Sequence, residues 1–180
     1  MTGEAPERLA ERALSRVPEW IWDGETLPVP IDDIADSCFN LHVREVDDLT
    51  SAPGLPKVAS DQSLSGLLLP GLGEIWVNAH EARDWPHRRR FTIGHELGHW
   101  CMHRTNGAPL YCRHAVVAEE RAKPSVPPAE EEANAFAAAL LMPAQLVERE
   151  YQRDSRDFWK LCETFGVSGA AMGRRLHAVI

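Results

Sequence analysis

The spacing of apolar residues predicts helices toward the start of the chain, followed by a short run of strands. Apolar residues recur at helical spacing over residues 5–17 and again over 31–39. In the second of these helices, one face is expected to carry Ile31, Ile34, Ala35 and Cys38. Residues 41–46, LHVREV, alternate apolar and polar side chains instead, which predicts a half-buried strand.

A hairpin and then a series of helices are expected in the rest of the chain. Residues 64–69 and 74–78 flank the turn sequence Pro70-Gly71-Leu72-Gly73, which predicts a β-hairpin. An irregular, proline-rich loop is expected over 104–128. The predicted helices cover about residues 88–103, 130–142, 155–165 and 168–178, and Pro143 could be the first residue of a further helix.

This order of helices, a small meander of strands and further helices predicts an α+β fold rather than alternating βαβ units. We expect a main domain over residues 1–150, in which a small antiparallel or mixed sheet packs on the 88–103 helix. Residues 151–180 are expected to form a helical hairpin that resembles a helix-turn-helix and packs on the same domain.

Composition narrows the class of protein. The 180 residues are 44% hydrophobic, which is enough for a core, and no apolar run is long enough to span a bilayer. The first residues, MTGEAPERLAERAL, are charged and contain no apolar signal region, so we expect a cytoplasmic location. In that setting the cysteines are expected to be reduced and mostly buried; they are Cys38, Cys101, Cys112 and Cys162.

Charge argues against a protein devoted to nucleic acid. The net charge is −8, whereas a surface that binds nucleic acid needs a basic field. Residues 151–180 carry five Lys or Arg against three Asp or Glu, which is a modest excess. We therefore expect the C-terminal hairpin to close the core or dock a partner, and not to read DNA directly.

The strongest chemical signal is His95-Glu96-Leu97-Gly98-His99, which matches the HExxH pattern. Positions four apart on a helix lie about 40° apart and one turn along, so both imidazoles can reach one zinc ion. Glu96 follows the first histidine and could act on a water molecule at that ion. The alternative is a core helix that carries two histidines with satisfied hydrogen bonds.

Two histidines leave a tetrahedral zinc ion short of one protein ligand and a water molecule. The segment PPAEEEANAFAAALLMP offers Glu130 as that ligand and Asn134, four residues later, as a hydrogen-bond partner for a ligand. Glu131 and Glu132 point about 100° and 200° away from Glu130, so one helix cannot present all three to one metal. The register of the third ligand is open by one or two residues.

Together these segments resemble the ImmA/IrrE family of zinc metallopeptidases. RRRFTIGHELGHWCMH, EEEANAFAAALLMP and FGVSGAAMGRRL occur in the family's order, and the similarity covers about residues 5–178. The resemblance implies a zincin-like fold and one zinc ion per chain, bound by His95, His99 and Glu130, with Glu96 as catalytic base. It also implies a protein substrate, since family members often cleave DNA-binding helix-turn-helix repressors, and others act in toxin–antitoxin-like pairs.

The function expected from these features is zinc-dependent hydrolysis of a peptide bond in a repressor or antitoxin-like regulator. A donor must then stabilise the tetrahedral oxyanion, and the candidates for oxyanion or substrate contacts are His103, Tyr111, His114 and Tyr151. For His103, a place at the margin of the site or at the helix end is the simpler expectation. The alternative function is a zinc-binding regulatory or interaction module with little or no hydrolysis.

Overall fold

A computed structural model describes residues 5–54, 64–103, 110–113, 127–153 and 157–180. In these residues the chain forms eight α-helices, a short 3-10 helix and a four-stranded sheet. The first half contains α1 (Pro6–Leu14), α2 (Ile31–Phe39), β1 (His42–Val46), η1 (Leu49–Ser51), β2 (Leu64–Leu69), β3 (Glu74–Asn78) and α3 (Ala79–Asp84). The second half contains α4 (Pro86–Met102), β4 (Leu110–Arg113), α5 (Pro128–Leu141), α6 (Ala144–Arg153), α7 (Phe158–Phe165) and α8 (Gly169–Val179).

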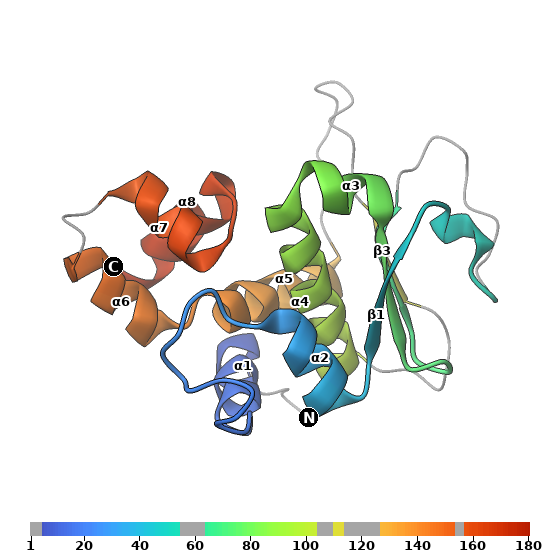
Figure 1. Ribbon diagram of the computed structural model, residues 1–180, viewed down its shortest axis with the longest axis horizontal. Coiled ribbons are helices and arrows are strands. Elements are labelled where there is room, and N and C mark those ends of the chain that lie inside the picture. Colours follow the sequence, from blue (N-terminus) through green and yellow to red (C-terminus); the bar gives the residue numbers. More distant parts are fainter. Residues whose placement is uncertain (1–4, 55–63, 104–109, 114–126, 154–156) are drawn as a thin grey trace.

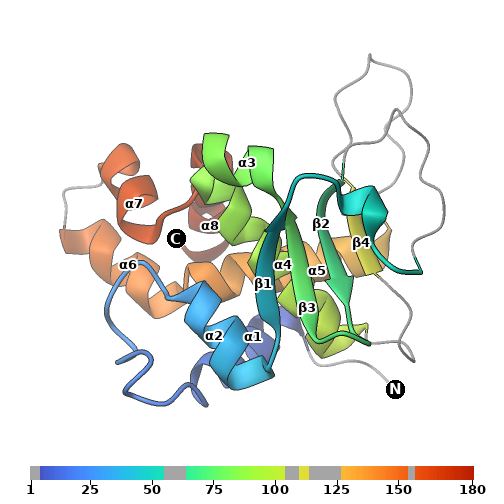
Figure 2. The ribbon, with the colours of Figure 1, turned by 45° about the vertical axis from the view of Figure 1, so that its right-hand side comes forward.

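The α+β class is confirmed, and the sheet is mixed. Its strand order is β1-β3-β2-β4, with β2 antiparallel to both neighbours and β1 parallel to β3 (Figure 2). The predicted hairpin is present as β2 and β3. Helix α2 ends at Asn40, whose φ is 54°, and β1 begins two residues later and pairs with β3.

One face of the sheet covers the main core. Ile75 and Val77 of β3 and Leu68 of β2 pack with α4, α5 and the C-terminal helices. On the other face Leu67, Leu69 and Trp76 form a smaller cluster with residues around η1. Every residue of β2 is therefore buried, since this strand lies inside the sheet and is covered on both faces.

The central helix α4 lies between the sheet and the remaining helices. Figure 1 shows the sheet on one side of α4 and helices α6 to α8 on the other, with α5 crossing behind. Helix α5 packs on both α4 and α1. Proline is the first residue of both α4 and α5, where its missing N–H costs nothing, so these helices begin two residues earlier than predicted.

Several expectations about elements are corrected. The segment 104–128 was expected to be a loop, but Leu110–Arg113 forms β4, because this short segment pairs with the edge of β2. The rest of that segment up to residue 126, including His114, lies outside the described residues. Helix α3 was not predicted; the Asn78 side chain starts it by accepting hydrogen bonds from the backbone N–H groups of His80 and Glu81.

The three cysteines whose side chains the structure describes are free, although one of them is placed differently from the expectation. Cys38 is exposed, because the buried residues of α2 are Ile31, Ile34 and Ala35, whereas residues 36–38 face solvent. Cys162 is buried and Cys101 is half-buried against the main core. Among the described helices, none is long and apolar enough to cross a membrane.

Candidate metal centre

The HExxH segment lies in the most buried part of α4. Residues 92–99 are all buried, because β2 covers one side of the helix and α5 covers another. Burial on several sides explains why this helix has no clear apolar stripe in its sequence. The two histidines and the glutamate are therefore held in a dry, crowded environment.

Two glycines let α5 approach α4 closely. Gly94 and Gly98 are four residues apart and face Ala137 and Ala133 on α5. A Cβ atom at position 98 would lie 3.0 Å from the Ala133 Cα and 3.1 Å from its carbonyl oxygen. The small residues on both helices thus set the distance at which side chains of α5 meet the histidines of α4.

This approach brings His95, His99 and Glu130 together. The Nε2 atoms of the two histidines are 3.0 Å apart, and each lies 3.1 Å from one oxygen of the Glu130 carboxylate. One ligand atom from each residue lies within 4.8 Å of the others. Burial opposes ionisation of Glu130, but its hydrogen bonds to His95 and His99 and their charges outweigh it, so its pKa falls to about 2.

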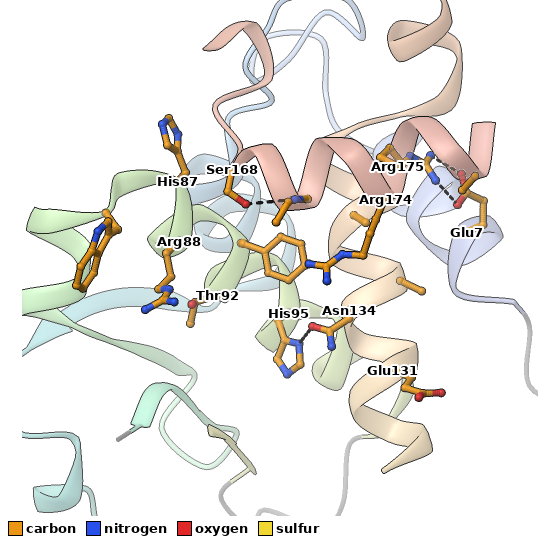
Figure 3. A pocket seen from close by; sticks show the side chains of 17 residues that line it. Glu7, His87, Arg88, Thr92, His95, Glu131, Asn134, Ser168, Arg174 and Arg175 are labelled. Atoms are coloured by element: carbon orange, nitrogen blue, oxygen red, sulfur yellow. Dashed lines mark hydrogen bonds and ion pairs between the residues drawn. The ribbon is translucent and has the colours of Figure 1, made fainter. Parts of the chain in front are cut away.

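The donor set fits a cation. The Nδ1 atom of His95 lies 3.0 Å from the Asn134 Oδ1 atom, and because an amide oxygen only accepts, the ring N–H donates there (Figure 3). With this proton on Nδ1, the Nε2 atom of a neutral His95 ring carries a lone pair. This lone pair faces the same point as the His99 Nε2 atom and the Glu130 carboxylate, where a cation could lie. Two imidazole nitrogens and one carboxylate converging in this way suit a zinc ion that keeps a further position for water.

His99 has support of its own on the far side of its ring. Its Nδ1 atom lies 3.2 Å from the Nδ1 atom of His103, whose Nε2 atom is 2.7 Å from a Glu132 oxygen. A carboxylate that accepts from His103 favours an imidazole that in turn accepts from His99. These contacts place His103 at the end of α4 and behind His99, where it can orient that ring.

The three consecutive glutamates therefore separate into three environments. Glu130 faces the two histidines, Glu132 contacts His103, and Glu131 lines a neighbouring cleft. Successive residues of a helix are 100° apart around its axis, so the three side chains must point in different directions. The sequence could not determine which of the three faces the histidines.

Glu96 points to the sheet side of α4. It is fully buried, and neither carboxylate oxygen has a hydrogen-bond partner among the described residues. Burial raises its pKa to about 8, with the charge of Glu130 adding to the rise and that of His99 opposing it. A carboxyl group whose pKa is raised in this way is suited to exchange protons near neutral pH.

Gly66 and Thr92, which the sequence reasoning missed, form the wall beside Glu96. A Cβ atom at position 66 would lie 2.3 Å from the Thr92 Cγ2 atom and 2.9 Å from Glu96 Oε1. The available signal was an isolated glycine inside an apolar strand, which often marks a close approach. Without the tertiary structure nothing identified α4 as the element that approaches.

The positions of the other residues predicted to contact the oxyanion or substrate do not test these roles. Tyr111 belongs to β4, where its backbone pairs with Leu67, and His114 lies outside the described residues. Tyr151 is on α6 and packs against the main core, not in the cleft beside His95. The oxyanion roles of these residues and of His103 stay predictions.

A cleft of about 1300 Å³ opens beside His95 and Asn134. Helices α4, α5 and α8 supply most of its walls, and its lining combines apolar and charged side chains (Figure 3). The candidate metal centre is therefore adjacent to a space large enough for a segment of a polypeptide.

A HExxH helix packed under a small mixed sheet, with a His-His-Glu cluster completed by a second helix, defines a metallopeptidase-like domain. The model of the IrrE N-terminal-like domain family, Peptidase_M78, matches residues 60–177. The chain belongs to this family, as its resemblance to the ImmA/IrrE metallopeptidases predicted. No curated protein matches the chain.

Proposed function

We propose that the protein is a zinc-dependent endopeptidase whose substrate is a protein, namely a helix-turn-helix repressor or an antitoxin-like regulator. The observation that carries the catalytic part is the convergence of His95 Nε2, His99 Nε2 and the Glu130 carboxylate beside Glu96. Membership of a peptidase family supports a protein substrate in general. The repressor is proposed from the resemblance to ImmA/IrrE proteins.

Each residue has a defined task in this proposal. His95, His99 and Glu130 would hold one zinc ion, while Asn134 fixes the His95 ring through its Nδ1–H group. When bound, zinc supplies a Lewis acid that lowers the pKa of a water molecule and polarises the scissile carbonyl.

Glu96 would act as the general base and acid. It would accept a proton from the attacking water and then deliver this proton to the leaving amine. Gly66 and Thr92 keep the carboxyl group in a narrow, dry space, which limits how far it can turn away from that path. The positive charge of a bound cation would favour its ionised form and offset the effect of burial.

A second function is favoured by one observation, the complete burial of Glu96. A carboxyl group with a raised pKa and no hydrogen-bond partner in the described ranges of the chain could remain protonated and contribute little to catalysis. The protein would then be a zinc-binding regulatory or interaction module with little or no hydrolysis.

The two functions are separated by Glu96→Gln. The experiment mixes the zinc-loaded protein with the repressor encoded nearest to its gene and follows the repressor by mass spectrometry. For an endopeptidase we expect the unmodified protein to cut the repressor, and Glu96→Gln to reduce the rate by at least about a hundredfold with zinc still bound. Equal function of the two proteins in the cell, with no cut in either case, would support the binding module.

A matched control tests the metal part of the proposal. Glu131→Gln changes a neighbouring carboxylate that lies outside the His-His-Glu cluster, and Glu130→Gln changes the member of the cluster. We expect zinc content to fall in Glu130→Gln and to be unchanged in Glu131→Gln. Equal zinc content in both variants would argue against Glu130 as the third ligand.

A further inference from the structure

The cleft beside His95 has one wall that the catalytic proposal does not use. This wall is α8, which contributes Ser168 at its N-cap, Ala170, Ala171, Arg174, Arg175 and Ala178 to the lining. Phe91, Ala135 and Ala138 from α4 and α5 supply much of the opposite, apolar lining. The C-terminal helix therefore faces His95 and its partner Asn134 across the cleft.

The two consecutive arginines of α8 have different surroundings. Arg175 is buried and tied into the fold: its guanidinium makes two contacts of 2.6 and 2.8 Å to the Glu7 carboxylate and donates from Nε to the Met142 carbonyl oxygen. Arg174 is exposed and has no ion pair or hydrogen bond within the described part of the chain. Its charge is therefore available to a ligand.

Arg174 points into the cleft. Figure 3 shows its side chain descending from α8 toward the level of His95 and Asn134, and all three residues line the same space. Arg175 points the other way, to Glu7 on α1. An arginine fork in a partly apolar space is well suited to bind a carboxylate through two hydrogen bonds.

Among the described residues that line the cleft, the other arginines have partners, and Arg174 is the free cation. Arg88 lies over the Trp85 ring at 5.3 Å and is 3.5 Å from Glu81. Glu7 is neutralised by Arg175, and Glu131 directs its carboxylate away from Arg174 (Figure 3). An acidic ligand group would thus meet a positive charge here, although the chain as a whole carries −8.

We propose that this cleft is the specificity site for the protein substrate and that Arg174 binds an Asp or Glu side chain near the bond to be cut. Neighbouring apolar side chains of the substrate would lie against Phe91, Ala135 and Ala138. The proposal rests on the endopeptidase function and adds the chemistry of the substrate segment. It also gives the helix-turn-helix-like end of the chain a task other than binding DNA, since one arginine of α8 is buried and the other faces the cleft.

Binding can be measured apart from hydrolysis. The probe is an array of short peptides of random sequence. Each peptide is present in three versions that are identical except at one position, which is Glu, Gln or Lys. It is exposed to full-length, zinc-loaded protein that carries Glu96→Gln. We expect the Glu versions to be bound more strongly than the Gln versions by about fivefold on average.

The variant Arg174→Glu tests whether this arginine causes the preference for Glu, and Arg16→Glu is the control. Arg16 is an exposed residue outside the cleft, so both variants change the net charge by the same amount. We expect Arg174→Glu to abolish the preference for Glu and to favour the Lys versions, and Arg16→Glu to retain the preference for Glu. Arg174→Gln, which is expected to abolish the preference without reversing it, replaces Arg174→Glu if the latter does not fold.

Each result decides the proposal. The proposal would be overturned if the protein showed no preference for Glu, or if Arg174→Glu or Arg174→Gln left this preference unchanged. It would also be overturned if Arg16→Glu lost the preference to the same extent. The unmodified, zinc-loaded protein could show an Arg174-dependent preference for Glu and yet cut no peptide or repressor. This result would overturn the endopeptidase function and leave a cleft that binds acidic peptides. The two proposals therefore fail by different measurements.

Discussion

At the scale of single residues, Glu96 is completely buried, and in the part of the chain that the structure describes its carboxyl group has no hydrogen-bond partner. Its pKa of about 8 lies well above the ordinary value of 4.5 that applies to the unfolded chain. The folded protein therefore binds this proton more tightly than the unfolded protein does. Ionising Glu96 in the metal-free protein must then reduce the stability of the fold.

The corresponding prediction concerns the metal-free protein and Glu96→Gln. Between pH 4.5 and 8 the free energy of unfolding of the unmodified protein should fall relative to that of the variant, by roughly 1.4 kcal/mol for each unit of pKa difference. The two proteins should therefore differ least near pH 4.5 and most above pH 8. Urea unfolding in the presence of a chelator, at several pH values, measures this difference; a constant difference would contradict it.

Gly66 is the residue on which the position of Glu96 depends. In Gly66→Ala the new methyl group would meet the Thr92 Cγ2 atom at 2.3 Å and the Glu96 Oε1 atom at 2.9 Å, so the carboxyl group must move. We expect peptidase activity to fall by about tenfold or more while zinc remains bound, because displacements of about 1 Å carry such costs. Activity and zinc content are measured on the same preparation.

A second substitution tests the cause. Thr92→Ser removes the Cγ2 atom that the new methyl group would meet most closely, and so the double variant should regain part of the activity. If Gly66→Ala were as active as the unmodified protein, the wall beside Glu96 would not position it.

At the scale of elements, the crossing of α4 and α5 determines whether the ligands can meet. Gly98 leaves no room for a methyl group, since its Cβ atom would approach the Ala133 backbone at 3.0 and 3.1 Å. Glu130 and Asn134 lie on the same helix as Ala133, so any outward shift of α5 moves them away from the two histidines. Backbone atoms cannot rotate aside as side chains can, so a methyl group at position 98 would have to push the two helices apart.

We therefore predict that Gly98→Ala weakens both the fold and the metal site. The overpacked interface should lower the free energy of unfolding by about 1–3 kcal/mol and reduce zinc affinity. Gly173→Ala is the matched control, because a Cβ atom there meets nothing within 4 Å and the position is helical. The control should gain roughly 0.5–1 kcal/mol. Calorimetry and a competitive zinc indicator give the two quantities, and unchanged zinc affinity in Gly98→Ala would contradict the prediction.

At the scale of the whole molecule, the candidate metal centre connects the two large helices of the core. His95 and His99 belong to α4 and Glu130 belongs to α5, and the two helices also hold much of the hydrophobic core between them. A ligand that binds only the folded chain stabilises it in proportion to the logarithm of its concentration over its dissociation constant. Zinc should therefore affect global stability as well as chemistry.

Removal of the metal provides the test at this scale. We expect a chelator to lower the melting temperature of the zinc-loaded protein by several degrees, and added zinc to restore it. The melting temperature of His95→Ala should respond little to either treatment, since one ligand of the cluster is missing. A chelator response of equal size in this variant would place the stabilising metal elsewhere.

The family and the α+β class could be predicted from the sequence because their signals are local. A period of 3.6 residues relates His95 to His99, and Glu130 to Asn134, without any knowledge of the rest of the chain. Two short segments that flank a glycine-rich turn likewise indicated β2 and β3. What the spacing could not supply was the orientation of one helix relative to another.

The sequence by itself determined that one helix could offer two histidines and a glutamate to a metal ion, and that a second helix carried an acidic candidate ligand four residues before an asparagine. Only the tertiary structure decided that Glu130 and not its neighbours faces the histidines, that β4 extends the sheet, and that Arg174 enters the cleft while Arg175 is buried. The physical reason is that dihedral preferences and periodicity act over a few residues. Distances between segments far apart in the chain depend on how closely small residues such as Gly66, Gly94 and Gly98 allow those segments to pack.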